Sequence, residues 1–204
     1  MALPARRRAT YQDVLDAPSN LVAEVIAGEL HLSPRPAGGH ASASGELLGE
    51  LLFPFGRGRG GPGGWLFLPE PELHLGAAPD ILVPDLAAWR RERLPSIDPA
   101  VAFFTLRPDW VCEVLSPRNA RLDRAEKLPL YASYGVPHAW LVDPLARTLE
   151  ALELTSGKWL LLGTWQEDDV VTAAPFDAVP LELGVLWGNF AKPPAKPGKA
   201  RRKK

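Results

Sequence analysis

The spacing of apolar residues changes along the first third of the chain, from the alternation typical of strands to the spacing typical of helices. Alternation over residues 22–27 and 29–32, with Gly28 between them, predicts a β-hairpin. Leucines then recur at helical spacing over residues 42–52, and Pro54 is expected to end that helix. The chain therefore begins as a mixture of strands and helices.

The rest of the chain continues this mixture. Short apolar runs predict strands over residues 65–68, 72–75, 81–87, 110–115 and 138–142, and a closing hairpin that joins 148–154 to 159–165. Pro84 lies inside the third of these runs, so that strand is expected to be bent or near an edge. A helix is expected from Ala120 to Tyr134. This order predicts an α/β or α+β fold in which helices flank a mixed β-sheet, with additional hairpins near both ends.

Charge is distributed unevenly along the 204 residues. Seven of the 23 basic residues follow Phe190, where no acid occurs, and the remaining 16 face 24 acidic residues. We therefore expect one domain over residues 10–190, a disordered basic N-terminus over 1–9 and a disordered basic tail over 191–204. An acidic body does not suit a protein that grips DNA over a wide face. It suits a focused site in which a cation lies between carboxylates and nucleic acid.

Other features limit the class of protein. The chain has one cysteine, Cys112, so no internal disulfide can form, and its apolar neighbours favour a buried thiol over a nucleophile. No apolar stretch approaches the length of a membrane span, and Arg6–Arg8 are not followed by the apolar segment of a secretory signal. The expected location is the cytoplasm.

The glycine-rich segment 56–64 contains a formal GxGxxG match. A dinucleotide site is excluded, because that motif requires a strand before it and a helix after it, and here the order is reversed. The segment is either a flexible loop or a loop that contacts phosphates through Arg57 and Arg59. Trp89, next to Arg90 and Arg91, is a further candidate for contact with nucleic acid, or else a surface lid over the core. Arg57, Arg59 and Arg91 are thus the candidate nucleic-acid-binding residues.

Two acids lie within apolar segments. Glu113 is embedded in Val111-Cys112-Glu113-Val114-Leu115, and Asp85 follows Ile81-Leu82-Val83-Pro84. An ionised carboxylate in such a setting is costly unless a cation or hydrogen-bond donors compensate for it. Either acid alone could cap a strand end and face water. Together they favour a site for a hard divalent cation, which prefers oxygen ligands and can activate a water molecule for phosphodiester hydrolysis.

The predicted helix that follows Glu113 supplies a third element. Asp123, Lys127 and Tyr131 are spaced four residues apart and so share one face. From that face Lys127 could orient a nucleophilic water or stabilise charge on a phosphate. The alternative is an ordinary exposed Asp–Lys pair, and the spacing alone leaves the two interpretations open.

Several segments together resemble the Uma2 family of bacterial proteins over about residues 11–190. They are Val83-Pro84-Asp85, the run from Pro108 to Pro117, the Asp123, Lys127 and Tyr131 series, and the run from Gly135 to Pro144. The resemblance implies a restriction-endonuclease-like fold of the PD-(D/E)XK nuclease group.

It also implies roles for individual residues. Asp85 would be the metal-binding aspartate, Glu113 its partner and Glu24 an additional acid near the site. His40 matches a family histidine to which we assign no role, and a hydrogen-bonding residue at a helix start is the alternative. Catalysis would therefore rest on Asp85, Glu113, Lys127 and Glu24.

One position departs from the pattern of the nuclease group. Leu115 stands where the group usually has a lysine two residues after the acid, and the resemblance implies that Lys127 supplies the amine instead. Asp80 is a rival metal ligand, but a five-residue separation from Asp85 would put the two on opposite faces of a regular strand, so Asp85 is preferred.

The leading hypothesis is a magnesium-dependent endonuclease that hydrolyses phosphodiester bonds in DNA, with manganese as a substitute ion and a homodimer as the expected assembly. The displaced lysine and the acidic body favour the alternative of an inactive nuclease fold that binds nucleic acid or protein. A glycosidase with paired carboxylates is a weaker third hypothesis.

Overall fold

The structure is a computed structural model that describes residues 7–190. The predicted basic tail and residues 1–6 of the predicted N-terminal segment lie outside this range. Within it, Arg7 forms an ion pair with Asp13 (2.6 Å), and the backbone N–H of Ala9 donates to the carbonyl of Gly28 (2.8 Å). None of the helices described in residues 7–190 is long and apolar enough to cross a membrane.

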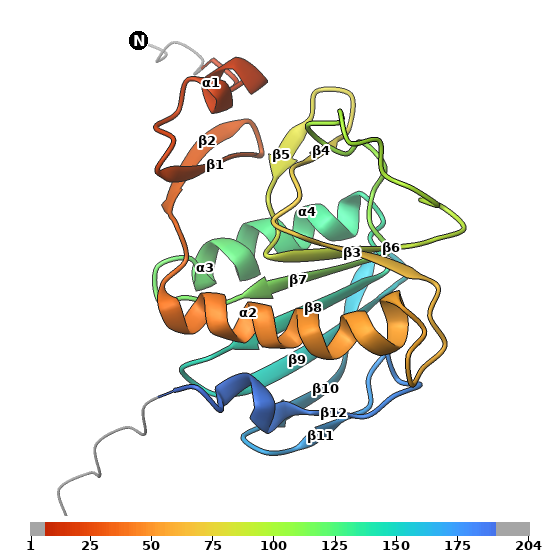
Figure 1. Cartoon of the computed structure of the whole chain (residues 1–204). Helices are drawn as coiled ribbons and strands as arrows, with labels where there is room; N and C mark the ends of the chain where they lie inside the picture. The colour runs from red at the N-terminus through yellow and green to blue at the C-terminus, as the bar shows by residue number, and fades with distance from the viewer. Residues whose placement is uncertain (1–6, 191–204) are drawn as a thin grey trace, which may run out of the picture.

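A small antiparallel sheet forms the N-terminal part of the molecule (Figure 1). Its strand order is β2-β1-β5-β4, and the short helix α1 precedes it. The bounds are α1 Tyr11–Leu15, β1 Leu21–Ile26, β2 Glu29–Pro34, β4 Leu73–Leu75 and β5 Asp80–Leu82. Ala27 and Gly28 both have positive φ in the β1–β2 turn, which confirms the predicted hairpin and its turn.

A mixed six-stranded sheet forms the centre of the molecule. Its order is β10-β9-β8-β7-β6-β3, and β7 and β8 are parallel while the other neighbours are antiparallel. The bounds are β3 Trp65–Pro69, β6 Leu86–Arg90, β7 Trp110–Val114, β8 His138–Asp143, β9 Thr148–Thr155 and β10 Lys158–Gln166. This arrangement confirms the predicted mixed sheet.

Helices cover both faces of the large sheet. The helical bounds are α2 Gly38–Leu51, η1 Leu52–Gly56, α3 Ala120–Leu122, η2 Asp123–Lys127, α4 Leu128–Ser133 and η3 Leu183–Trp187. Helix α2 lies across one face and the α3–η2–α4 segment lies across the other (Figure 1). Strands β11 Val170–Val171 and β12 Leu181–Glu182 form a separate two-stranded sheet, and η3 lies beside it.

Strand β7 divides its side chains between these two faces. Trp110, Cys112 and Val114 join the core that includes α2, while Val111 and Leu115 join the core that includes α4. Alternation therefore directs Glu113 towards the α3–η2–α4 segment. All five residues of β7 are buried, as the apolar pattern predicts.

The predicted single strand over 81–87 is wrong. The segment instead forms two strands: β5 belongs to the small sheet and β6 belongs to the large one. Pro84 lies at the break, where its missing N–H removes a ladder bond. Asp85 therefore lies outside both strands, immediately before β6.

The prediction that Pro54 ends the second helix is also wrong. The helical path continues through Pro54 as the π-helical turn η1 and ends at Gly56. Trp89 was predicted to lie at the surface, but its side chain is 0% exposed and its indole N–H donates to the carbonyl of Leu106 (2.9 Å). Burial within the core thus excludes Trp89 as a nucleic-acid contact.

Candidate active site

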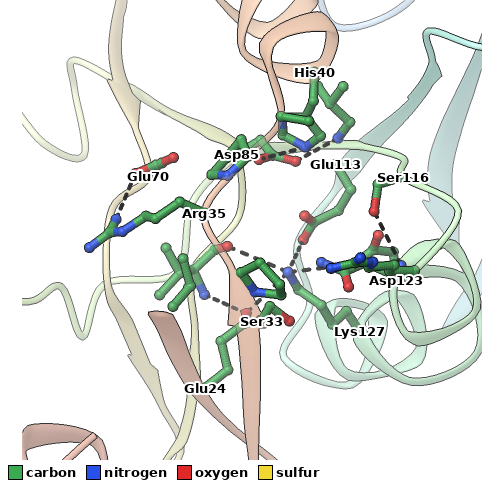
Figure 2. Close-up of a pocket in the computed structure, with 18 of the residues that line it drawn as sticks. Glu24, Ser33, Arg35, His40, Glu70, Asp85, Glu113, Ser116, Asp123 and Lys127 are labelled. Atoms are coloured by element: carbon green, nitrogen blue, oxygen red, sulfur yellow. Dashed lines mark hydrogen bonds and ion pairs between the residues drawn. The ribbon is translucent and has the colours of Figure 1, made fainter. Parts of the chain in front are cut away.

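One cavity of about 420 Å³ lies where the β1–β2 hairpin, the C-terminal end of β7 and the π-helical turn η2 meet. Its walls include six of the residues that the sequence singled out. They are Glu24, His40, Asp85, Glu113, Asp123 and Lys127. Figure 2 shows their side chains turned towards a common centre from separate elements of the chain.

Glu113 is the deepest of the acids. Its residue is 2% exposed, and its Oε1 accepts hydrogen bonds from the Tyr131 hydroxyl (2.7 Å) and from Lys127 Nζ (2.8 Å). Burial raises the pKa of Glu113 well above its usual range, and the charges of Asp123, Asp85 and Glu24 raise it further, while Lys127 opposes the shift. The site therefore gathers acidic groups where water is excluded, and this environment disfavours the ionised form of Glu113.

Asp85 approaches Glu113 from the position immediately before β6, the strand that neighbours β7. The antiparallel register that pairs Leu86 with Cys112 places Asp85 opposite Glu113 when it is extended by one residue. The backbone N–H of Val114 donates to Asp85 Oδ2 at 2.7 Å, which fixes the carboxylate beside the end of β7.

His40 holds the other oxygen of the same carboxylate. Its Nε2 lies 3.2 Å from Asp85 Oδ1, and the ring comes from the first turn of α2. Burial alone would lower the pKa of His40, but the hydrogen bond to Asp85 and the charge of Asp85 outweigh it, so the pKa is raised. The sequence did not suggest this contact. Through it, His40 positions the carboxylate of Asp85.

Lys127 lies at the centre of the cluster and is 3% exposed. Its Nζ is 2.8 Å from Glu113 Oε1, 3.1 Å from Glu24 Oε1 and 3.7 Å from Asp123 Oδ1. Burial alone would lower the pKa of Lys127, but these carboxylates raise it well above its usual value. The structure contradicts an exposed Asp–Lys pair and favours the interpretation in which the amine belongs to the site.

Glu24 is positioned by the N-terminal hairpin. It lies on β1, which pairs with β5 through Val25 and Ile81, and its Oε1 accepts a hydrogen bond from the Val83 N–H (2.8 Å). Lys127 Nζ also lies 3.4 Å from the Val83 carbonyl oxygen. The small sheet therefore closes one side of the cavity. The contacts of Glu24 and Lys127 with Val83 link this side to the segment before Asp85.

The turn η2 has π-helical geometry, and this geometry affects the site directly. Asp123 and Lys127, its first and last residues, are both buried. α4 continues η2 without a break, so Pro129, its second residue, lacks the N–H that a regular α-helix through both segments would use there. Such turns often occur at functional sites. Burial raises the pKa of Asp123 to about 6.

Leu115, two residues after Glu113, is 3% exposed and packs among apolar residues of α4 and β8. Lys127 reaches Glu113 from the next helical segment instead. The amine beside Glu113 therefore comes from η2 and not from the strand that carries the acid.

The carboxylates fit a hard cation. Four of them, from Glu24, Asp85, Glu113 and Asp123, line the cavity against one lysine, and their mutual repulsion contributes to the raised pKa of Glu113. Within residues 7–190 no three His, Cys, Asp or Glu side chains are grouped as a metal-binding cluster. Magnesium does not require one, because it is commonly held by one or two carboxylates, with waters and substrate phosphates as its other ligands.

Other candidates from the sequence lie elsewhere. Arg57, Arg59 and Arg91 do not line the cavity: the first two follow η1, and the Arg91 N–H donates to Gly64 at the end of β6 far from Asp85. Asp80 is also absent from its walls, and its carboxylate is bound by Arg8 (3.3 Å) and the Tyr134 hydroxyl (2.6 Å). The preference for Asp85 over Asp80 agrees with this geometry.

Two arginines at the cavity were not anticipated. Arg35 and Arg118 both line it, and both are exposed. Each lies beside a proline in a connecting segment, Arg35 between β2 and α2 and Arg118 between β7 and α3. A signal was present in the sequence, because the second segment directly follows the strand that carries Glu113.

Comparison with known proteins places this geometry in context. The family model described as "Uma2: Putative restriction endonuclease" matches residues 9–184. A search of curated proteins finds no match. Among solved structures, a similar fold occurs in a protein from Anabaena variabilis ATCC 29413 described as "a putative nuclease belonging to DUF820". The two share 21% sequence identity and a TM-score of 0.68, over 88% of this chain and 97% of the other.

Proposed function

Because the chain belongs to the Uma2 family of restriction-endonuclease-like proteins, we propose that it is a magnesium-dependent endonuclease that hydrolyses phosphodiester bonds in DNA. The observation that carries the proposal is the meeting of Asp85, Glu113 and the buried amine of Lys127 in one cavity. This combination matches the metal ligands and the cationic group of a PD-(D/E)XK nuclease, although the lysine comes from a different element.

In this proposal Asp85 and Glu113 hold the ion. Asp85, immediately before β6, and Glu113, on β7, offer carboxylate oxygens, with His40 and the Val114 N–H orienting Asp85. When bound, magnesium supplies polarisation of a phosphate oxygen and lowers the pKa of a water molecule. The chain contributes the orientation of these ligands and the exclusion of bulk solvent.

Lys127 would act on the phosphate or on the attacking water. Its ammonium lies beside Glu113, where it can donate to a nucleophilic water or stabilise negative charge on the phosphate. Glu24 shares the same amine and would assist by keeping it in place. A phosphate that enters the cavity would compete with the carboxylates for the donors of Lys127.

The experiment is cleavage of plasmid and single-stranded DNA by the full chain, with magnesium and with EDTA. Glu113→Gln removes the charge of one ligand while it retains the shape of the side chain, and Glu126→Gln on the exposed surface of η2 is the matched control. We expect magnesium-dependent cleavage by the wild type and by Glu126→Gln, and its loss in Glu113→Gln. Cleavage that persists in Glu113→Gln, or none by the wild type on either DNA, would overturn the proposal.

One observation favours a second function, a catalytically silent nuclease fold that binds nucleic acid or protein. Lys127 is already paired with Glu24, Glu113 and Asp123, so its donors are engaged within the chain. Binding of DNA by the purified protein without magnesium-dependent cleavage would identify this alternative.

A further inference from the structure

The rim of the cavity differs in charge from its floor. The reactive groups of the floor are acidic and recessed, whereas the exposed cations that line the cavity are Arg35 and Arg118. Figure 2 shows Arg35 and Glu70 on one side of Glu113 and Lys127, and Ser116 on the other. Arg35 comes from the β2–α2 connection and Arg118 from the β7–α3 connection, so the two arginines reach the cavity from separate segments of the chain.

The two arginines also differ in their partners. Arg35 forms an ion pair with Glu70 at 3.5 Å, and both side chains are well exposed, at 57% and 42%. The guanidinium of Arg118 forms no hydrogen bond or ion pair within the described part of the chain, 7–190. The Arg118 guanidinium is therefore free for a ligand. Arg35 is held by Glu70, but the pair is exposed to water, which weakens it.

The depth of the site limits what can reach it. The side chains of Glu113, Lys127 and Asp85 are 3%, 4% and 16% exposed, so a phosphate must enter the cavity to contact them. A volume of about 420 Å³ is that of a small-molecule site, which accommodates a nucleotide-sized group but not the width of a double helix. Enzymes that act on a stacked base take single strands or first extrude the nucleotide, and a phosphate that must enter a recessed cavity likewise favours a flexible, unpaired strand.

We propose that this site takes an unpaired DNA strand, with the scissile phosphate in the cavity and the neighbouring phosphates bound by Arg35 and Arg118. This inference rests on the proposed function, because it names the substrate class of the same site. The acidic floor would repel a polyanion, and the two rim arginines offset that repulsion where the strand enters and leaves. Glu70 competes with the phosphate for Arg35, so its removal should strengthen binding.

The first test measures binding without chemistry. Fluorescence anisotropy of a labelled single-stranded oligonucleotide and of its duplex, in EDTA, is compared for the full-length wild type and Arg35→Gln/Arg118→Gln. We expect the wild type to bind the single strand more tightly than the duplex. The double variant should lose about tenfold in affinity for the single strand, and its salt dependence should fall by about 1.4 in the slope of log K against log salt.

Two control variants make this test specific. Arg121→Gln removes an exposed arginine of α3 that does not line the cavity, and Arg57→Gln/Arg59→Gln removes the pair after η1. Both should bind the single strand as the wild type does, and Glu70→Gln should bind it more tightly. Equal binding of single strand and duplex, no binding of either, or a loss confined to Arg57→Gln/Arg59→Gln would overturn the inference.

Cleavage in magnesium separates this inference from the proposed function. If the wild type cuts duplex DNA as fast as single strands and Glu113→Gln abolishes both activities, the endonuclease stands and the single-strand inference fails. If no DNA is cut but single-strand binding still depends on Arg35 and Arg118, the endonuclease fails and the strand-binding site stands.

Discussion

Lys127 Nζ lies 2.8 Å from Glu113 Oε1, and the two side chains are only 4% and 3% exposed. A pair so deeply buried is expensive to break, because the partner that remains is an uncompensated charge away from water. Two further carboxylates, those of Glu24 and Asp123, depend on the same amine. Lys127 therefore has a structural role in addition to the chemical one proposed for it.

This relationship predicts a large loss of stability when the amine is removed. Lys127→Met should lower the free energy of unfolding by about 3–5 kcal/mol in EDTA. Urea denaturation of the metal-free protein measures the change. Arg124→Gln is the control, because its ion pair with Glu150 is partly exposed at 44% and 26% and should contribute at most about 1 kcal/mol. A small loss in Lys127→Met would show that the cluster is not held by its lysine.

Position 115 tests whether the lysine could be returned to the strand. Leu115→Lys should destabilise the protein by several kcal/mol, because an ammonium would be buried among the apolar residues of α4 and β8. Leu115→Met should cost less than about 1.5 kcal/mol. The double variant Leu115→Lys/Lys127→Met should remain inactive in the cleavage assay. Restored cleavage would mean that residue 115 can reach the cavity.

His40 is predicted to act through Asp85. His40→Ala removes the contact between Nε2 and Asp85 Oδ1 and should weaken magnesium or manganese binding by about 10–100-fold. His40→Gln, which can still donate a hydrogen bond, should recover part of that loss. Calorimetric titration of the metal in the absence of DNA reads out this effect separately from catalysis, and unchanged affinity in His40→Ala would refute the positioning role.

The buried acids predict how stability depends on pH. Burial raises the pKa of Asp123 to about 6, so in the folded state it retains a proton that the unfolded chain has lost by that pH. The resulting stability is fully present below about pH 4 and is lost as the pH rises through 6, which corresponds to about 3 kcal/mol for a shift of this size. The raised pKa values of Glu113 and His40 act in the same direction.

Thermal unfolding in EDTA at several values between pH 4 and pH 8 measures this dependence. Asp123→Asn should lose less stability than the wild type over that range. His138, whose pKa is lowered by burial, titrates in the opposite sense in both proteins, so the difference between them isolates the cavity. Identical pH profiles for the two proteins would contradict the assignment.

Much of the fold follows from local patterns in the sequence. The alternation around Gly28 and the apolar run around Glu113 predict β1, β2 and β7, because local geometry and burial decide these elements. The division of residues 81–87 between two sheets was missed, since strand pairing depends on distant parts of the chain. The continuation of the helical path from α2 through Pro54 was missed, because the π-helical turn η1 accommodates a residue without an N–H.

The site likewise has features that the sequence predicts and features that depend on contacts between distant segments. An acid inside an apolar strand is visible in the sequence, and the structure brings Asp85, Glu113 and Lys127 to one cavity. The contact of His40 with Asp85 and the places of Arg35 and Arg118 on the rim arise from the meeting of separate loops and helices. No spacing along the chain encodes such contacts, so they required the coordinates.

The central claim is that Asp85 and Glu113 hold one divalent cation. Crystals soaked in manganese and measured at a wavelength of anomalous scattering test it most directly. The account predicts one strong anomalous peak in the cavity, at about 2.1 Å from a carboxylate oxygen of each acid. A cavity without a peak at saturating manganese, or a peak bound by other residues alone, would contradict it.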